Sequence, residues 1–396
     1  MKSLLASIVS AVLLMQGCGG SAMSGSEPLS DSAEVRATPI VARVDNVPIP
    51  VKGSDNRFHV VYELTLVNFT GGTASLQRLN VLDARSRAVV ASLDAGQFAQ
   101  RLAVASSRSS ALAELGPSQT GLVYLHLTFD DPSAIPATLT HELTLTLTLN
   151  GQPVTETVAP TAVNPPTNLV LAPPLKGGRY VAGDGCCDSI RHVRATLPLN
   201  GHLYNGQRFA IDWELLDAQG RIHTGDPKVL QNYAIYGQPV FAVADATVIA
   251  AVDGMPDSPP GALPANIGIE QADGNHVILD LGNGHYALYA HLAPNSVKVV
   301  QGQRVRQGDV LGHVGSSGNS SEPHLHFQVS DGPNPLASNG VPYLIGQFVS
   351  SQRGVSTEAF DQAIVDGQPL ALQPLDGSPQ HVSALPLDLS IVDFTH

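Results

Sequence analysis

Two histidines on one predicted strand are the residues of this sequence best placed to do chemistry. His324 and His326 lie in the segment 322–329, where apolar residues alternate with polar ones. Because side chains two residues apart share a face of a strand, the two imidazoles should project together. Such a pair can hold a divalent metal ion, or divide the work between a metal ligand and a proton carrier. It can equally be a solvent-exposed pair with neither role.

A predicted hairpin adds a third histidine. Strand-like runs at 277–281 and 285–291 flank a Gly-Asn-Gly turn, and Asn-Gly between two strands is a strong hairpin signal. His291 stands at the end of the second strand. We therefore expect it near the other two histidines, at an edge where functional sites are often built.

An aspartate offers the carboxylate that such a site needs. Asp212 lies between Ile211 and Trp213, at the polar phase of an apolar strand. It can serve as a metal ligand. It can equally be a strand-end residue paired with Arg208.

The elements that must position these residues are short strands. The chain has 396 residues with 37 glycines, 29 prolines and a single tryptophan, which favours strands and turns over long helices. Within residues 38–158, leucines and threonines alternate at 143–149, and turn signals separate several such runs. We predict an antiparallel β-sandwich there. Its three histidines, His59, His126 and His141, are expected at surface or satisfied core positions.

The remaining chain divides at a proline-rich segment. Residues 159–178 are predicted to be a semi-rigid linker between the sandwich and a second domain at 179–349, which carries the candidate site. Residues 350–396 form a C-terminal tail to which we assign no function. The predicted fold class is all-β.

Net charge and the N-terminal segment limit the partners and the cellular location that can be expected. The formal net charge is −13, which argues against nucleic acid as a partner. Residues 1–37 are read as a leader and flexible tether, because one lysine precedes an apolar run at 4–15 that is too short to span a bilayer comfortably. Cys18 follows this run as in a bacterial lipoprotein signal, so a lipid anchor at Cys18 is possible. Otherwise Cys18 belongs to a cleaved leader.

The other two cysteines are adjacent in sequence. Cys186 and Cys187 can form a vicinal disulfide, stay reduced or pair between chains, and the sequence does not choose among these states. They lack the two-residue gap with which a pair of cysteines holds one ion, which argues against zinc at this pair.

Several segments in order resemble one family. The segment 322–326 (Glu-Pro-His-Leu-His), preceded by 289–292 (Tyr-Ala-His-Leu) and 315–320 (Gly-Ser-Ser-Gly-Asn-Ser), resembles the LytM/lysostaphin-type zinc peptidases of the M23 family. Segments 236–240 and 302–312 add to the match. The resemblance implies a β-sheet-rich, barrel-like fold with a groove over one zinc ion per chain.

The resemblance also implies residue roles. His326 and Asp212 would be zinc ligands, and His291 and His324 would be the catalytic histidines that handle protons and the transition state. The remaining ligand should be an upstream histidine, but the position four residues before Asp212 holds Arg208.

Two histidines are available for that third place. His192 follows a basic residue, and His202 lies in Gly-His-Leu. We favour His192, with the residues up to Asp212 forming an inserted loop, and leave His202 as the alternative.

The implied function is that of an exported zinc metalloendopeptidase that cleaves peptide bonds in bacterial peptidoglycan. The implied location is the cell envelope, either periplasmic or lipid-anchored at the outer surface of a membrane. One alternative is an inactive LytM-like module that binds the wall or activates other hydrolases. A biotinyl- or lipoyl-like carrier is disfavoured, because Lys228 and Lys298 do not sit at a hairpin tip. The sequence leaves the oligomeric state open.

Overall fold

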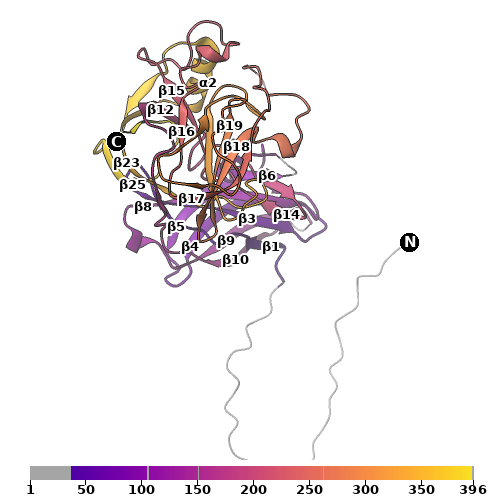
Figure 1. Ribbon diagram of the computed structural model, residues 1–396. Helices are drawn as coiled ribbons and strands as arrows, with labels where there is room; N and C mark the ends of the chain where they lie inside the picture. Colours follow the sequence, from indigo (N-terminus) through magenta and orange to yellow (C-terminus); the bar gives the residue numbers. More distant parts are fainter. Residues whose placement is uncertain (1–36, 105–106, 150, 262, 395–396) are drawn as a thin grey trace, which may run out of the picture. The chain divides into compact units, whose positions relative to one another are not determined.

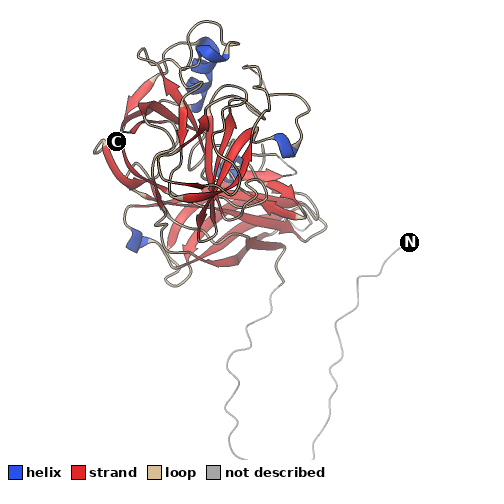
Figure 2. Cartoon of the chain, in the orientation of Figure 1, coloured by secondary structure: helices blue, strands red, loops and turns tan. Residues whose placement is uncertain are grey.

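Strands make up most of the part of the chain that the computed structural model describes, which is residues 37–396 without 105–106, 150, 262 and 395–396 (Figure 2). The all-β prediction is therefore confirmed. The predicted leader, with Cys18 and its lipid anchor, lies outside the described residues. Among the described helices, none combines the length and the apolar character that crossing a bilayer requires.

Residues 40–162 form two five-stranded sheets, coloured indigo to magenta in Figure 1. The first sheet contains β1 (Ile40–Val44), β2 (Val51–Lys52), β3 (Phe58–Asn68), β6 (Leu102–Val104) and β8 (Thr120–Phe129). The second contains β4 (Ala74–Asp83), β5 (Val89–Asp94), β7 (Glu114–Leu115), β9 (Thr138–Leu147) and β10 (Pro153–Ala162). Short helices follow two of these strands, namely α1 (Ala95–Arg101) and η1 (Pro132–Ala134).

The alternating leucines of β9 face the core between these sheets. Leu143 and Leu145 are fully buried, and Leu147 is 9% exposed. Leu149, which continues the alternation in the sequence, is 65% exposed. The reason is that β9 ends at Leu147, and the period-two rule applies only while the chain stays extended.

Residues from 170 onward build one large sheet of twelve strands. Ten strands follow the order β11 (Val170–Leu171), β23 (Leu344–Gly354), β26 (Ser390–Phe394), β12 (Gly177–Gly183), β15 (Ile211–Leu216), β22 (Leu325–Ser330), β19 (His285–Leu292), β18 (Asn275–Gly282), β17 (Ala246–Val252) and β20 (Arg304–Val305). The other two, β24 (Leu372–Pro374) and β25 (Gln380–Ala384), pair with β23. In this order β11 and β20 are the two ends, so the described sheet is not a closed barrel.

Smaller elements complete this half of the molecule. Two two-stranded sheets pair β13 (Leu197–Leu199) with β14 (His202–Tyr204), and β16 (Pro239–Phe241) with β21 (Val310–His313). The remaining helices are η2 (Leu230–Asn232), η3 (Ile269–Gln271) and α2 (Thr357–Asp366).

The predicted hairpin is confirmed as β18 and β19. Gly282 pairs with His285, so Asn283 and Gly284 form the two-residue turn. Both turn residues have positive φ, 54° and 75°. These are the values that a type I′ turn requires and that asparagine and glycine tolerate best.

The chain on either side of the predicted domain boundaries shares sheets and cores. Residues 39–396 form one compact unit. Leu171 and Leu175, in the predicted linker, are buried in the core of the large sheet, as are Val392 and Phe394 of the predicted tail. The division of the chain into separate domains at residues 158, 178 and 349 stays a prediction.

A buried ion pair joins the sandwich to the large sheet. Arg208 donates to both carboxylate oxygens of Glu63 in β3, at 3.0 and 2.5 Å, and Asn205 donates to the same carboxylate at 2.8 Å. Glu63 and Arg208 are each less than a tenth exposed. Asp212 was expected either to bind a metal or to pair with Arg208. The pairing with Arg208 is not formed, because Glu63 is the partner of this guanidinium.

Candidate metal centre

Three neighbouring strands of the large sheet bring the predicted residues together. β22 lies between β15 and β19, and in this register Asp212 is opposite His326, which is opposite Ala290. Asp212 and His326 therefore face each other across one strand pair. His291 follows Ala290 near the end of β19, and His324 directly precedes β22. Because β19 and β22 are antiparallel, both histidines lie at the same end of this strand pair.

The loop after β12 supplies a second imidazole beside Asp212. Gly183, the last residue of β12, is paired with Asp212, so the loop begins next to the carboxylate. His192 in this loop places its Nε2 3.2 Å from Asp212 Oδ2. The ligand atoms of His192, Asp212 and His326 all lie within 4.8 Å of one another. His202 lies exposed in the β13–β14 hairpin and is not part of this cluster.

A glutamine fixes the orientation of the His326 ring. The side-chain amide nitrogen of Gln328 donates to the Pro335 carbonyl at 3.1 Å, so Gln328 Oε1 faces His326. His326 Nε2 lies 2.9 Å from this oxygen and must donate its hydrogen to it. The lone pair of Nδ1 then points at Asp212 Oδ1, 2.8 Å away.

That arrangement leaves two acceptors in contact. A lone pair and a carboxylate oxygen at hydrogen-bond distance need a cation between them, which can be a proton or a metal ion. His192 Nδ1 is buried and has no hydrogen-bond partner. Two imidazoles and one carboxylate are a donor set that suits Zn²⁺ and leaves a coordination position open. The residues present therefore fit a zinc ion.

Two further histidines flank the three candidate ligands. His291 Nδ1 donates to the carbonyl of Ser317 at 2.8 Å, and His324 Nδ1 donates to the carbonyl of Glu322 at 2.9 Å. In the neutral rings each Nε2 is therefore an acceptor. The two rings are 4.7 Å apart between centroids, and His324 Nε2 lies 3.6 Å from Asp212 Oδ1.

The backbone at His291 adopts an uncommon conformation. Its φ is +61°, in the left-handed region that residues other than glycine rarely occupy. Its N–H donates to the Asp273 carbonyl, and its carbonyl accepts from the Gly315 N–H at 3.1 Å. These contacts hold the end of β19 in place. Tyr289, two residues earlier, is buried in the core.

The charges of the cluster depend on one another. Burial raises the pKa of Asp212, but the imidazoles of His192, His324 and His326 outweigh burial and hold this pKa well below its usual range. Burial lowers the pKa of His192, and the Asp212 carboxylate outweighs that effect and raises it. Burial, with the neighbouring His324 and His326, lowers the pKa of His291 well below its usual value. His291 is therefore a neutral ring.

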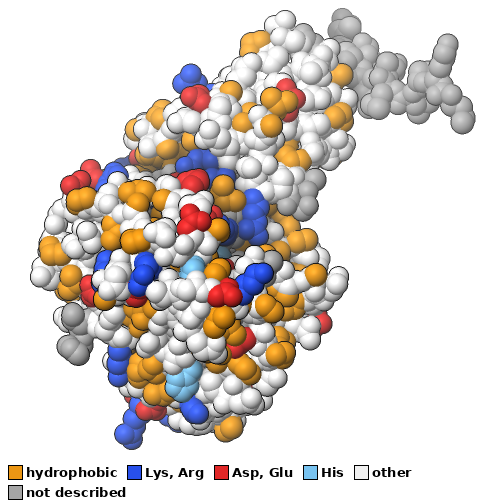
Figure 3. All heavy atoms as spheres, turned by 90° about the horizontal axis from the view of Figure 1, so that it is seen from above, with side chains coloured by type: hydrophobic (Ala, Val, Ile, Leu, Met, Phe, Trp, Pro, Cys, Tyr) orange, Lys and Arg blue, Asp and Glu red, His pale blue; other side chains and the backbone are white. Residues whose placement is uncertain are grey.

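The cluster opens into a cavity of about 640 Å³. Besides the five site residues, its lining includes Tyr233, Glu322, Lys228 and Leu263, so it combines aromatic, charged and apolar side chains. On the face seen in Figure 3, histidine atoms reach the surface among basic, acidic and hydrophobic side chains. A cavity of this size and lining can admit a peptide segment.

Sequence reasoning missed Gln328, although the signal was present. Gln328 lies two residues after His326 on the same strand, and the period of two puts their side chains on one face. The carbonyls of Ser317 and Glu322, which accept from His291 and His324, gave no such signal. Residue types do not predict the direction of a carbonyl group in a loop.

Comparison with known families agrees with the motifs. Residues 230–338 match the model of Peptidase family M23, which confirms the resemblance for this part of the chain. The match contains His291, His324 and His326. His192 and Asp212 lie upstream of it.

Curated relatives are similar over the same part of the chain. A DD-carboxypeptidase/endopeptidase Mpg of Neisseria meningitidis is 34% identical over 116 residues, which is 29% of this chain and 22% of that protein. Lysostaphin of Staphylococcus staphylolyticus is 40% identical over 74 residues, which is 18% of this chain and 15% of that protein. The chain thus matches between 15% and 22% of the length of these relatives.

Solved structures show a weaker likeness. The catalytic domain of lysostaphin from Staphylococcus simulans covers 42% of this chain and 88% of its own, with 21% sequence identity and a TM-score of 0.23. A TM-score of this size carries no structural argument.

Proposed function

We propose that this chain is a zinc metalloendopeptidase that hydrolyses peptide bonds in bacterial peptidoglycan, starting from the match of residues 230–338 to peptidase family M23. The observation that carries the proposal is the meeting of His192, Asp212 and His326 at one point inside a cavity. A relative named as a peptidoglycan DD-endopeptidase, ShyC of Vibrio cholerae, which is 38% identical over 58 residues, supports the substrate class.

His192, Asp212 and His326 would hold one Zn²⁺. When bound, this ion polarises the scissile carbonyl and lowers the pKa of a water molecule towards neutrality. Gln328 accepts the hydrogen of His326 Nε2, which would leave the Nδ1 lone pair available to hold the ion.

His291 and His324 would move the protons. Each ring donates Nδ1–H to a backbone carbonyl, so each Nε2 can accept a proton from the attacking water. The protonated ring can then stabilise the negative charge of the tetrahedral carbonyl oxygen and return the proton to the leaving amine. Because peptidoglycan lies outside the cytoplasm, the proposal also places the chain in the cell envelope.

Metal content tests this proposal directly. The full chain, purified without chelator or added metal, is expected to hold about one zinc. His326→Ala should lose the zinc, while His324→Ala should keep it and lose hydrolysis of purified peptidoglycan. His202→Ala is the matched control, because this exposed histidine lies outside the cluster.

Three outcomes would contradict all or part of the proposal. Stoichiometric zinc in His326→Ala would show that His326 is not a ligand. Absence of zinc, with none taken up on addition, would favour the inactive module that binds the wall or activates other hydrolases. Loss of zinc in His202→Ala but not in His192→Ala would exchange the roles of these two histidines.

A further inference from the structure

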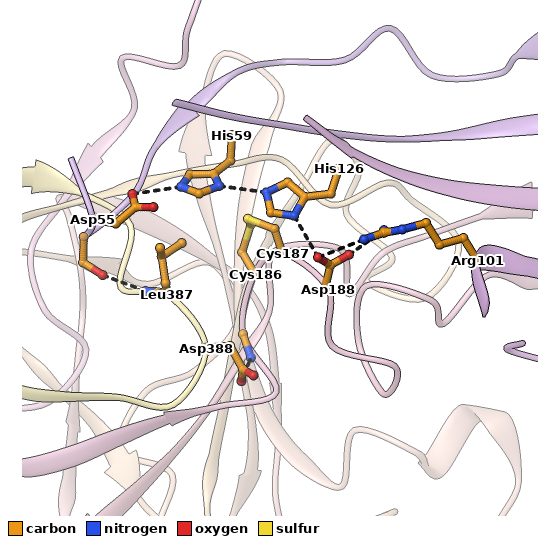
Figure 4. Close-up of a disulfide and its surroundings, with 11 residues drawn as sticks. Asp55, His59, Arg101, His126, Cys186, Cys187, Asp188, Leu387 and Asp388 are labelled. Atoms are coloured by element: carbon orange, nitrogen blue, oxygen red, sulfur yellow. Dashed lines mark hydrogen bonds and ion pairs between the residues drawn. A yellow bond between two sulfur atoms is a disulfide. The ribbon is translucent and has the colours of Figure 1, made fainter. Parts of the chain in front are cut away.

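A second cluster of potential metal ligands lies where the sandwich meets the large sheet (Figure 4). His59 is on β3 and His126 is on the neighbouring strand β8. Cys187 comes from the loop after β12 and is joined to Cys186 by a disulfide. The two ring nitrogens and the Cys187 sulfur lie within 4.8 Å of one another.

The outer nitrogen of each ring faces a carboxylate. His59 Nε2 lies 3.0 Å from Asp55 Oδ1, and His126 Nδ1 lies 2.9 Å from Asp188 Oδ2. Arg101 donates to both oxygens of Asp188 at 2.6 and 3.2 Å. Both Asp188 oxygens accept from the Arg101 guanidinium, so this carboxylate offers only acceptor oxygens to His126. Asp55 Oδ1 likewise accepts from the Arg57 N–H at 2.9 Å. Both carboxylates thus act as acceptors, and the outer ring nitrogens carry the hydrogens.

The inner nitrogens then face each other. His59 Nδ1 and His126 Nε2 are 2.8 Å apart. A dashed line joins these two rings in Figure 4. With both outer positions protonated, the inner atoms present two lone pairs, and a cation must lie between them. Imidazoles that donate their outer N–H to a carboxylate while the inner nitrogen binds a metal are the usual arrangement in metal sites.

The redox state of Cys187 decides what that cation is. In the disulfide its sulfur is a weak donor, and a proton shared between the rings is enough. A thiolate is a strong ligand for zinc and related ions. We infer that reduction of the Cys186–Cys187 disulfide creates a second metal site, formed by His59, His126 and the Cys187 thiolate, for a thiophilic transition-metal ion such as Zn²⁺.

The reaction balances with a dithiol as reductant. The dithiol gives two electrons and two protons to the disulfide and becomes a disulfide itself, leaving two cysteine thiols. The metal ion then displaces the Cys187 thiol proton and the proton shared by the two rings, and both protons pass to solvent. A cavity of about 700 Å³, lined by Asp55, His59, His126, Cys187 and Asp188 among others, gives access to this point.

The sequence argued against zinc at the two adjacent cysteines because they cannot hold one ion as a pair. The structure provides different partners for Cys187, namely two histidines 67 residues apart that neighbouring strands bring together. This site shares no ligand with His192, Asp212 and His326.

Cobalt(II) distinguishes the two sites, because only a site with a thiolate gives a sulfur-to-cobalt charge-transfer band. The full chain carrying Cys18→Ser, to remove an unrelated thiol, is titrated with Co²⁺ before and after reduction by a dithiol that is then removed without oxygen. We expect the band to grow to one equivalent in the reduced protein and to be absent from the oxidised protein.

Single-cysteine variants sharpen the test. Cys186→Ser leaves Cys187 as a free thiol and should bind Co²⁺ with the band without any reductant. Cys187→Ser should show no band in either state, and His59→Ala and His126→Ala should lose it after reduction. Far-ultraviolet circular dichroism of each variant checks that it has folded.

No band in both the reduced parent and folded Cys186→Ser overturns the inference. A band of full height in both histidine variants also overturns it, since the thiolate would then bind cobalt without these rings. Neither outcome depends on the His192–Asp212–His326 centre, because that centre contains no sulfur.

Discussion

At the scale of single residues, the proposed zinc centre depends on which ring nitrogen carries a hydrogen. His326 can offer Nδ1 to an ion only if Nε2 holds the hydrogen, and the Gln328 carbonyl oxygen ensures this. Gln328 is itself fixed because its amide group donates to the Pro335 carbonyl. Gln328 is thus a positioning residue that acts through His326.

We expect Gln328→Leu to weaken zinc binding by about 10- to 100-fold, the usual cost of removing a hydrogen-bond partner of a metal-binding histidine. Competition with a chelator of known affinity measures the change. Gln347→Leu, at an exposed position of β23, is the matched control. Equal zinc affinity in both variants would show that Gln328 does not position His326.

At the scale of secondary-structure elements, the buried Glu63–Arg208 pair connects β3 of the sandwich to the segment that leads into β15. Arg208 lies four residues before Asp212. The position of the Asp212 carboxylate therefore depends on a contact with a distant part of the chain.

Glu63→Gln should lower the free energy of unfolding by about 3 to 5 kcal/mol, because it leaves the Arg208 guanidinium buried without a counter-charge. Urea denaturation at neutral pH measures this value. The control is Asp130→Asn, which breaks an exposed pair with Arg57 and should cost under about 1 kcal/mol. A similar loss in the two variants would contradict a structural role of the buried pair.

At the scale of the whole molecule, a buried carboxylate that belongs to neither cluster makes folding stability depend on pH. Glu156 in β10 is 7% exposed, and burial raises its pKa to about 7. The unfolded chain loses this proton at lower pH than the folded chain does. The contribution of Glu156 to folding stability is therefore fully present below the pKa that this residue has in the unfolded chain. It is lost as the pH rises towards 7.

Glu156→Gln should remove this loss. Relative to the parent, the variant should be more stable at pH 8 by up to about 3 kcal/mol, and close to the parent at pH 4. Urea midpoints at the two pH values measure the difference. Glu114→Gln, at an exposed position in β7, controls for the loss of one negative charge. An unchanged pH dependence in Glu156→Gln would contradict the raised pKa.

The sequence by itself determined the features that local periodicity and turn chemistry dictate. The His324–His326 pair, the strand of Asp212 and the hairpin that contains His291 all result from the period of two and from the Asn-Gly turn. These rules hold over a few residues, since side-chain direction in a strand depends only on the backbone nearby. The fold class rests on the same signals.

Only the tertiary structure decided which distant groups meet. It places His192 rather than His202 against Asp212, because the loop after β12 begins beside that strand. It pairs Arg208 with Glu63, and it places Cys187 next to two histidines of the sandwich. Such contacts depend on the order of strands in the sheet and on the packing of one core against another. The spacing of residues along the chain predicts neither.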